Sequence, residues 1–279
     1  MNQSVVDFAV DAVHRRIGVP VEATLIPGGE PSLALVPSGV HQHDSFAVRF
    51  SPGWRAAMAE FVPGKFAAPL IPLMGKADSG SRSTFAAFAD ALKARRTHLS
   101  FRVNGTDISP FNTTDWPDNW IQVSLQARSA RQVIEPNDIA QMRQLILDLV
   151  IPVFGMVVAL IGIEEDERPV EGVSEGMPTQ VIATRYERKM VNREACIQLK
   201  GLRCAACGFD FSDFYGPLGV GYVEIHHTIP ISRIGPDYRI NVSTDLEPLC
   251  ANCHAMVHRE NPPIPVPVLA GLISHRREG

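Results

Sequence analysis

The spacing of apolar positions predicts both strands and helices in the first 160 residues. Apolar residues alternate with others at 46–50, 99–103 and 121–125, which is the period of a strand with one buried face. The pair Asn104-Gly105 follows the second of these stretches and is a strong hairpin signal. Residues 81–96 have helical spacing with basic residues at the end. These segments predict an N-terminal domain of the α+β class.

The most apolar stretch, 145–163, continues a helix that Asn137 or Asp138 can cap. It is close in length to a membrane span, but Asp148 and Pro152 interrupt it. Because nothing else in the chain is adapted to a membrane, the stretch favours a buried core helix, and we expect no membrane partner.

A composition change marks a domain boundary after this helix. The segment between residues 164 and 180 is acidic, contains Pro and Gly and has no periodic apolar pattern, which is typical of a linker. We therefore predict an N-terminal α+β domain at 1–164, a linker at 165–180 and a second domain at 181–279. A mixed-charge helix is expected at 185–199. A chain of 279 residues can bury two separate cores.

Charge and the N-terminus narrow the class further. The net charge of −4 argues against general coating of nucleic acid, so a nuclease with this balance needs local positive charge or metal ions. The first residues lack the basic start and apolar core of a signal peptide, and we expect a cytoplasmic protein. In a reducing cytoplasm, paired cysteines indicate metal before disulfide.

Four of the five cysteines form two pairs with two residues between the members. Each such knuckle can turn both thiolates toward one tetrahedral ion, and two knuckles complete the closed four-sulfur site typical of structural zinc. The alternative is that the cysteines are small buried hydrophobes. The zinc ligands predicted here are Cys204, Cys207, Cys250 and Cys253, and the remaining Cys196 is predicted to be a core residue.

Four histidines lie close to these knuckles in the sequence. His226 and His227 are adjacent, whereas His254 and His258 are four residues apart and share one face if the segment is helical. Two imidazoles so placed can hold a divalent cation. A packed helix or a second zinc-ligand set is the alternative. Because the cysteines already satisfy a structural zinc, the histidines favour a second, open metal site.

From about Ala195 to Pro263 the chain resembles the HNH nuclease superfamily. The matching pieces are RCAAC, EIHHTIP, TDLEPLC and ANCHAMVH. The resemblance implies a small zinc-bound ββα-metal domain, with 223–227 on the first strand and 253–258 beginning the helix. It also implies a metal-dependent endonuclease that hydrolyses DNA phosphodiester bonds, with double-stranded DNA as the expected partner.

The same resemblance implies roles for individual residues. His227 would be the general base that activates water, for which a neutral imidazole near pH 7 is suited. His226, His254 and His258 would hold the catalytic ion, although His226 should point to the opposite side of the strand from His227. The ion expected in the cell is Mg²⁺. Because three histidines are soft ligands for Mg²⁺, Mn²⁺, Co²⁺ or Ni²⁺ should also support activity.

One position departs from the family pattern. Asp245 stands where the family usually has an Asn that positions the loop holding the base. An ionised Asp accepts hydrogen bonds but cannot donate them. For Glu224, two interpretations stay open: it orients a neighbouring side chain, or it is an exposed strand residue.

The first domain is expected to choose the target, since an HNH unit has little sequence preference of its own. Aromatic residues beside basic ones can stack a base and hold its backbone, and the candidates are Trp54, Arg55, Trp116 and Trp120. Packing of the tryptophans in the core or at a strand edge is the other interpretation, and the sequence favours it. The domain order resembles that of type IV, modification-dependent restriction endonucleases of the McrA kind, which implies a defence enzyme and modified DNA as a substrate.

Two other functions stay open on the sequence. One is a mobile-element or phage HNH nickase that does not depend on DNA modification. The other is a zinc module without catalysis that only binds DNA or protein, against which the complete set of four histidines argues. A double-strand cut by a one-site nuclease commonly needs two subunits, so a homodimer is one expectation.

Overall fold

The computed structural model describes residues 1–27, 32–38, 45–65, 67–161, 185–229, 239–260 and 262–278. It divides into two compact units, Met1–Glu194 and Ala195–Gly279. The expected linker at 165–180 lies outside the described residues. Helix α6 (Arg185–Lys200) lies where a helix was predicted, and it contributes residues to both units.

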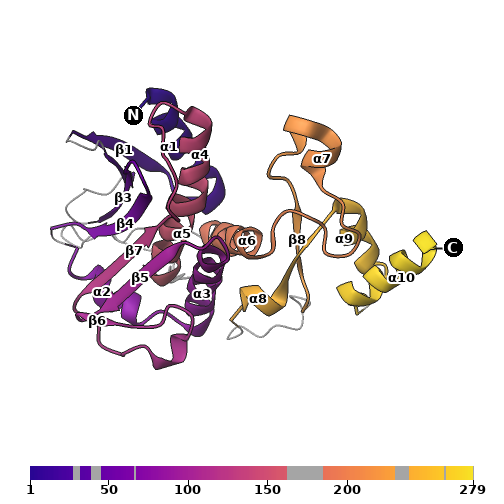
Figure 1. The fold of residues 1–279 in the computed structure, drawn as a ribbon. Helices are drawn as coiled ribbons and strands as arrows, with labels where there is room; N and C mark the ends of the chain where they lie inside the picture. The colour runs from indigo at the N-terminus through magenta and orange to yellow at the C-terminus, as the bar shows by residue number, and fades with distance from the viewer. Residues whose placement is uncertain are drawn as a thin grey trace, which may run out of the picture. The chain divides into compact units, whose positions relative to one another are not determined.

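The first unit contains an antiparallel sheet of seven strands (Figure 1). Their order across the sheet is β1-β2-β3-β4-β7-β5-β6, so the second neighbour of β4, strand β7, comes from a later part of the chain. The predicted strands at 46–50 and 99–103 are confirmed as β3 and β5. The strands are β1 (Val21–Ile26), β2 (Ser32–Pro37), β3 (Phe46–Pro52), β4 (Ala57–Pro63), β5 (His98–Val103), β6 (Thr106–Asp107) and β7 (Val123–Arg128).

The predicted hairpin at Asn104-Gly105 is also confirmed. Both residues have positive φ, 52° and 80°, and they join β5 to the short strand β6. This is the backbone that a two-residue turn between right-twisted strands requires. The strand predicted at 121–125 begins later, at Val123, and Ile121 is 83% exposed before it.

Helices α1, α3, α4 and α5 lie on one side of this sheet (Figure 1). The helices of the unit before α6 are α1 (Gln3–Ile17), α2 (Leu70–Gly75), α3 (Ser79–Ala94), η1 (Thr113–Asp115), α4 (Ile139–Leu145), η2 (Ile146–Val150) and α5 (Ile151–Ile161). Helices α3 and α5 pack closely because position 155 is glycine. A Cβ there would lie 2.4 Å from the Phe88 ring, which no side chain can do without displacing it.

The long apolar stretch is the core of this unit. Asp138 caps α4 by accepting the Gln141 N–H at 3.0 Å, and the helix continues through a π-helical turn into α5. The run Ile139–Ile161 is long and apolar enough to cross a membrane, but 78% of its most apolar window is buried inside the unit. The burial supports a core helix.

Two of the tryptophans, Trp116 and Trp120, belong to the core of the first unit. Trp116 and Trp120 are 5% and 2% exposed and pack with Phe85 and Phe101. Their indole N–H groups donate to the carbonyl oxygens of Ser109 and Pro117. Neither ring offers an open face to DNA in this structure, and their burial supports the core packing that the sequence favoured over DNA binding for these two residues.

The second unit contains a two-stranded antiparallel sheet, with helices before the sheet, between its strands and after it. Strands β8 and β9 pair antiparallel, with His226 opposite Glu247 and His227 opposite Leu246. Helix α9 follows β9 directly, which gives the ββα order expected from the sequence, and the α+β class is confirmed for the chain. Its elements after α6 are α7 (Phe211–Tyr215), η3 (Gly216–Gly219), β8 (Glu224–His227), α8 (Val242–Asp245), β9 (Leu246–Leu249), α9 (Ala251–Val257) and α10 (Val266–Glu278).

Candidate functional site

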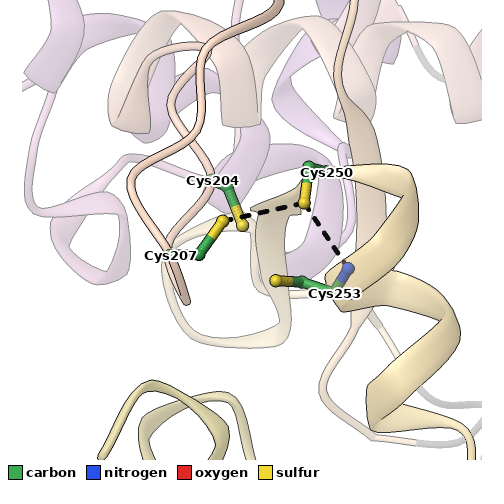
Figure 2. A group of neighbouring side chains, drawn as sticks. All are labelled: Cys204, Cys207, Cys250 and Cys253. Carbon is green, nitrogen blue, oxygen red and sulfur yellow. Dashed lines mark hydrogen bonds between the residues drawn. The ribbon is translucent and has the colours of Figure 1, made fainter. Parts of the chain in front are cut away.

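The four paired cysteines converge in the second unit. One sulfur from each lies within 4.8 Å of all the others, and Figure 2 shows the side chains gathered around a common point. The sulfurs of Cys207 and Cys250 are 3.7 Å apart. This is too far for a disulfide. It fits tetrahedral zinc, since Zn–S bonds of about 2.3 Å place neighbouring sulfurs about 3.8 Å apart.

Backbone hydrogen bonds shape both knuckles for this role. In the first, the Gly208 N–H donates to the Cys204 carbonyl at 2.8 Å, and Gly208 has a φ of 74° that favours glycine. In the second, Cys250 caps helix α9, and its sulfur accepts the Cys253 N–H at 3.4 Å. The Ala205 N–H donates to the Pro248 carbonyl at 2.8 Å, which fastens the first knuckle to β9 beside the second.

The electrostatics of the cysteine cluster favour a bound cation. Burial raises the pKa of the thiols of Cys207 and Cys253. At Cys204 burial also acts to raise the pKa, but backbone hydrogen bonds outweigh it and the pKa is lowered. Thiolates packed this closely repel one another, so a divalent ion is what would hold all of them deprotonated. The donor set therefore fits a structural zinc.

Three histidines form a second cluster. His226 from β8 meets His254 from α9 and His258 at the end of that helix, and one ring nitrogen from each lies within 4.8 Å of the other two. The ring centroids are 5.4, 5.0 and 5.1 Å apart, a nearly equilateral triangle. Three imidazoles arranged in this way can ligate one divalent ion and leave its other positions open.

His226 is the buried member of the triangle. It is 2% exposed, and its Nδ1 has no hydrogen-bond partner among the described residues. Burial, followed by the charges of His254 and His258, lowers the pKa of His226 to about 4. The ring is therefore neutral near pH 7 and keeps a lone pair for a metal. This buried imidazole fits a metal ligand better than a core residue.

Glu224 orients another member of the triangle. Its Oε2 lies 2.5 Å from Nδ1 of His254, and its Oε1 accepts the Tyr222 hydroxyl at 3.4 Å. A carboxylate on Nδ1 selects the tautomer with hydrogen on that atom and leaves Nε2 for a metal. Of the two interpretations left open by the sequence, the structure supports the orienting role.

A comparison with known families agrees with this geometry. Residues 204–260 match the family model of HNH endonucleases. The second unit contains an HNH endonuclease domain. The chain is therefore a nuclease that acts on DNA by hydrolysing phosphodiester bonds. No curated protein and no solved structure matches the chain.

Within the HNH domain, His227 lies on the strand beside the triangle but outside it. It directly follows His226 on β8, so the alternation of a strand points the two side chains to opposite faces. His227 is half-buried and stands opposite Leu246 in the hairpin register. The placement of the His226 and His227 side chains on opposite faces of β8 agrees with the expectation from the sequence.

Asp245 holds the end of the strand that carries His227. Its backbone carbonyl accepts the Thr228 N–H at 2.8 Å, one residue after His227. Its buried carboxylate accepts the Asn241 N–H at 2.7 Å and the Thr244 hydroxyl at 2.8 Å. Because the backbone makes the contact to the strand, the side chain only has to accept hydrogen bonds, which an aspartate can do.

The C-terminal end of helix α6 contacts strand β9, and this contact was not predicted from the sequence. The Lys200 ammonium donates to the Leu246 carbonyl at 2.7 Å and pairs with Glu247 at 2.8 Å. Cys196 is fully buried in the same contact, and its sulfur lies 3.7 Å from the Leu246 carbonyl. The prediction of Cys196 as a core residue is confirmed.

Proposed function

We propose that the chain is a restriction endonuclease in which the HNH domain cuts DNA and the N-terminal unit chooses the target. The observation that carries the catalytic part is the triangle of His226, His254 and His258 on the strand and helix next to His227. A zinc scaffold alone has no use for three converging imidazoles, whereas a phosphodiesterase needs an open metal site beside a base.

His227 is the general base of this proposal. A neutral imidazole near pH 7 takes a proton from water, and the water oxygen forms a bond to phosphorus. The bond from phosphorus to the leaving sugar oxygen breaks, that oxygen takes up a proton from solvent water, and His227 releases its proton to solvent. Asp245 acts indirectly, since it fixes the backbone at Thr228 and so limits the positions that His227 can adopt.

The two clusters have different roles. The cysteine site has all four ligands from protein and would hold structural Zn²⁺. The histidine triangle would hold the catalytic ion, Mg²⁺ in the cell with Mn²⁺, Co²⁺ or Ni²⁺ as substitutes. When bound there, a divalent cation polarises the scissile phosphate and neutralises charge on the leaving oxygen. Glu224 keeps His254 in the tautomer suited to that ligand role.

We assign target choice to the N-terminal unit because the HNH domain can carry out its chemistry without that unit. It has its own sheet and core and makes up residues 1–194. Its order before an HNH domain resembles modification-dependent restriction endonucleases of the McrA kind. This likeness supports modified DNA as the target and defence against foreign DNA as the role.

A panel of DNA substrates tests this proposal. Plasmids that are methylated, hydroxymethylated, phosphorothioated or plain are incubated with the full chain in Mg²⁺ or Mn²⁺, and nicked and linear products are measured. Cleavage of one modified class well above plain DNA is the expected result. Equal cutting of all four would contradict modification dependence and favour a mobile-element or phage nickase.

A further inference from the structure

One end of the sheet in the N-terminal unit brings together two segments that are distant in sequence, the turn 53–56 and residues 129–134, beside the start of β5. The turn 53–56 joins β3 to β4 and carries Trp54 and Arg55. Residues 129–134 run beside it. The Gln132 N–H donates to the Arg55 carbonyl at 3.0 Å, and the Ile134 N–H donates to the Trp54 carbonyl at 3.1 Å. Arg131 is therefore held next to the turn by backbone hydrogen bonds.

The adjoining strands add basic side chains on the face away from the helices. Arg128 of β7 pairs in register with Met58 of β4 and with His98 of β5, so the three side chains share one face. The preceding residue of β7, Ala127, is fully buried in the core on the opposite face. Arg128 and His98 are exposed, which agrees with their position on the face of the sheet that the helices do not cover.

This end of the sheet carries arginines that form no ion pair within the part of the chain that the structure describes. Elsewhere on the sheet the arginines are paired, as in Arg49 with Glu60 and Arg102 with Asp107. Among the described residues, Arg128 and Arg131 have no acidic partner, and both side chains are exposed. The segments 53–56 and 127–133 contain no Asp or Glu. Although the chain has a net charge of −4, this end of the sheet therefore carries a local group of three arginines, Arg55, Arg128 and Arg131.

Trp54 gives the same surface an aromatic element. It is 64% exposed, whereas the other two tryptophans of the chain are buried. The Arg55 guanidinium lies 4.1 Å from the centroid of its ring, a cation–π contact that holds the indole at the turn. A fixed aromatic ring between arginines is a common arrangement in nucleic-acid binding sites.

We propose that Arg55, Arg128 and Arg131 bind the phosphates of duplex DNA, with Trp54 contacting a sugar or an exposed base beside them. The surface formed by Trp54, Arg55, Arg128 and Arg131 is called the basic edge, and it is where the N-terminal unit holds the substrate. This inference rests on the proposed function, because it names the substrate-binding part of the unit assigned to target choice. It adds Arg128 and Arg131, which the sequence did not single out.

The test compares two triple variants of the full chain. Arg55→Ala/Arg128→Ala/Arg131→Ala removes the basic edge. Arg15→Ala/Lys76→Ala/Arg143→Ala removes the same charge from exposed positions on α1, directly after α2 and on α4. Binding of a fluorescently labelled plain duplex is measured by anisotropy over a range of salt concentrations without added divalent metal.

Loss of three phosphate contacts should weaken binding by about tenfold or more and reduce the slope of log affinity against log salt by about 2 to 3. The control triple should change neither quantity by as much. DNA should also quench the fluorescence of Trp54, and Trp54→Phe should bind better than Trp54→Ala because it keeps a ring. A basic-edge variant that binds with wild-type affinity and salt slope would overturn the inference, as would a wild type that does not bind duplex.

These outcomes are separate from those of the proposed function. A wild type that binds duplex through the basic edge but cuts no substrate in any metal supports this inference and contradicts the nuclease proposal. A wild type that cuts DNA while the basic-edge variant binds and cuts equally well supports the nuclease and contradicts this surface.

Discussion

The carboxylate of Glu224 on strand β8 lies 2.5 Å from Nδ1 of His254 on helix α9. This contact joins the two elements that supply the metal triangle, and it fixes one ligand before any ion is bound. Carboxylate partners of metal-bound histidines usually contribute a large part of the site's affinity. Glu224 is therefore a positioning residue whose effect should be seen in metal binding.

We expect Glu224→Gln to weaken binding of Mn²⁺ by about 10–100-fold, because an amide neither fixes the tautomer nor strengthens the imidazole as a ligand. Calorimetric titration of zinc-loaded protein measures the affinity directly. Glu247→Gln is the matched control, since Glu247 lies on the neighbouring strand and pairs with Lys200 instead of a triangle histidine. Equal Mn²⁺ affinity for Glu224→Gln and wild type would refute the positioning role.

The cysteine site should hold one zinc per chain, and its loss should unfold the HNH domain. Cys250→Ser removes a zinc ligand, whereas the serine hydroxyl can still accept the Cys253 N–H at the start of α9, so a loss of stability reports on the metal site. Elemental analysis should show zinc near one equivalent in wild type and far less in the variant. Cys196→Ser is the control, because Cys196 is buried outside the cluster. Unchanged zinc content in Cys250→Ser would disprove the assignment.

Acid should destabilise the HNH domain partly through His226. The folded pKa is lowered to about 4 from an unfolded value near 6.5, so the unfolded chain binds the proton first. Stability from this group is complete above about pH 6.5, falls as the pH drops below that value, and is fully lost below about pH 4. Between pH 7 and 5 the loss should be about 2 kcal/mol.

Urea unfolding of wild type and His226→Gln, both zinc-loaded and without a second metal, measures this effect. Gln cannot take up a proton, so the variant should lose less stability between pH 7 and 5 than wild type does. The same pH dependence in both proteins would show that His226 does not titrate as its burial implies.

The parts that sequence reasoning could predict are those encoded by short spacings. Two residues between cysteines and three between His254 and His258 constrain backbone geometry by themselves, so both clusters were expected before the fold was known. The strands β3 and β5 alternate because each has one buried face. In contrast, β2 is buried along its whole length and has no alternation to detect.

The parts that could not be predicted depend on contacts between distant segments. Trp54 and Trp116 are alike in sequence terms, but only the second lies against Phe85 and Phe101. Glu224 and His254 are thirty residues apart and meet only through the ββα arrangement. The contribution of Lys200 to the hairpin likewise requires knowing which helix packs against β9.

The central claim, that this chain cuts DNA with His227 as the base, is tested most directly by a plasmid-nicking assay on wild type and His227→Ala. With Mg²⁺ or Mn²⁺, wild type should cut and EDTA should stop it, whereas His227→Ala should be slower by about 10²–10⁴-fold. The variant should keep its zinc, its fold and its DNA affinity, because a general base acts mainly in the transition state. Cleavage by His227→Ala at the wild-type rate, or no cleavage by wild type of any plain or modified plasmid in any metal, would contradict the account and leave a zinc module that only binds.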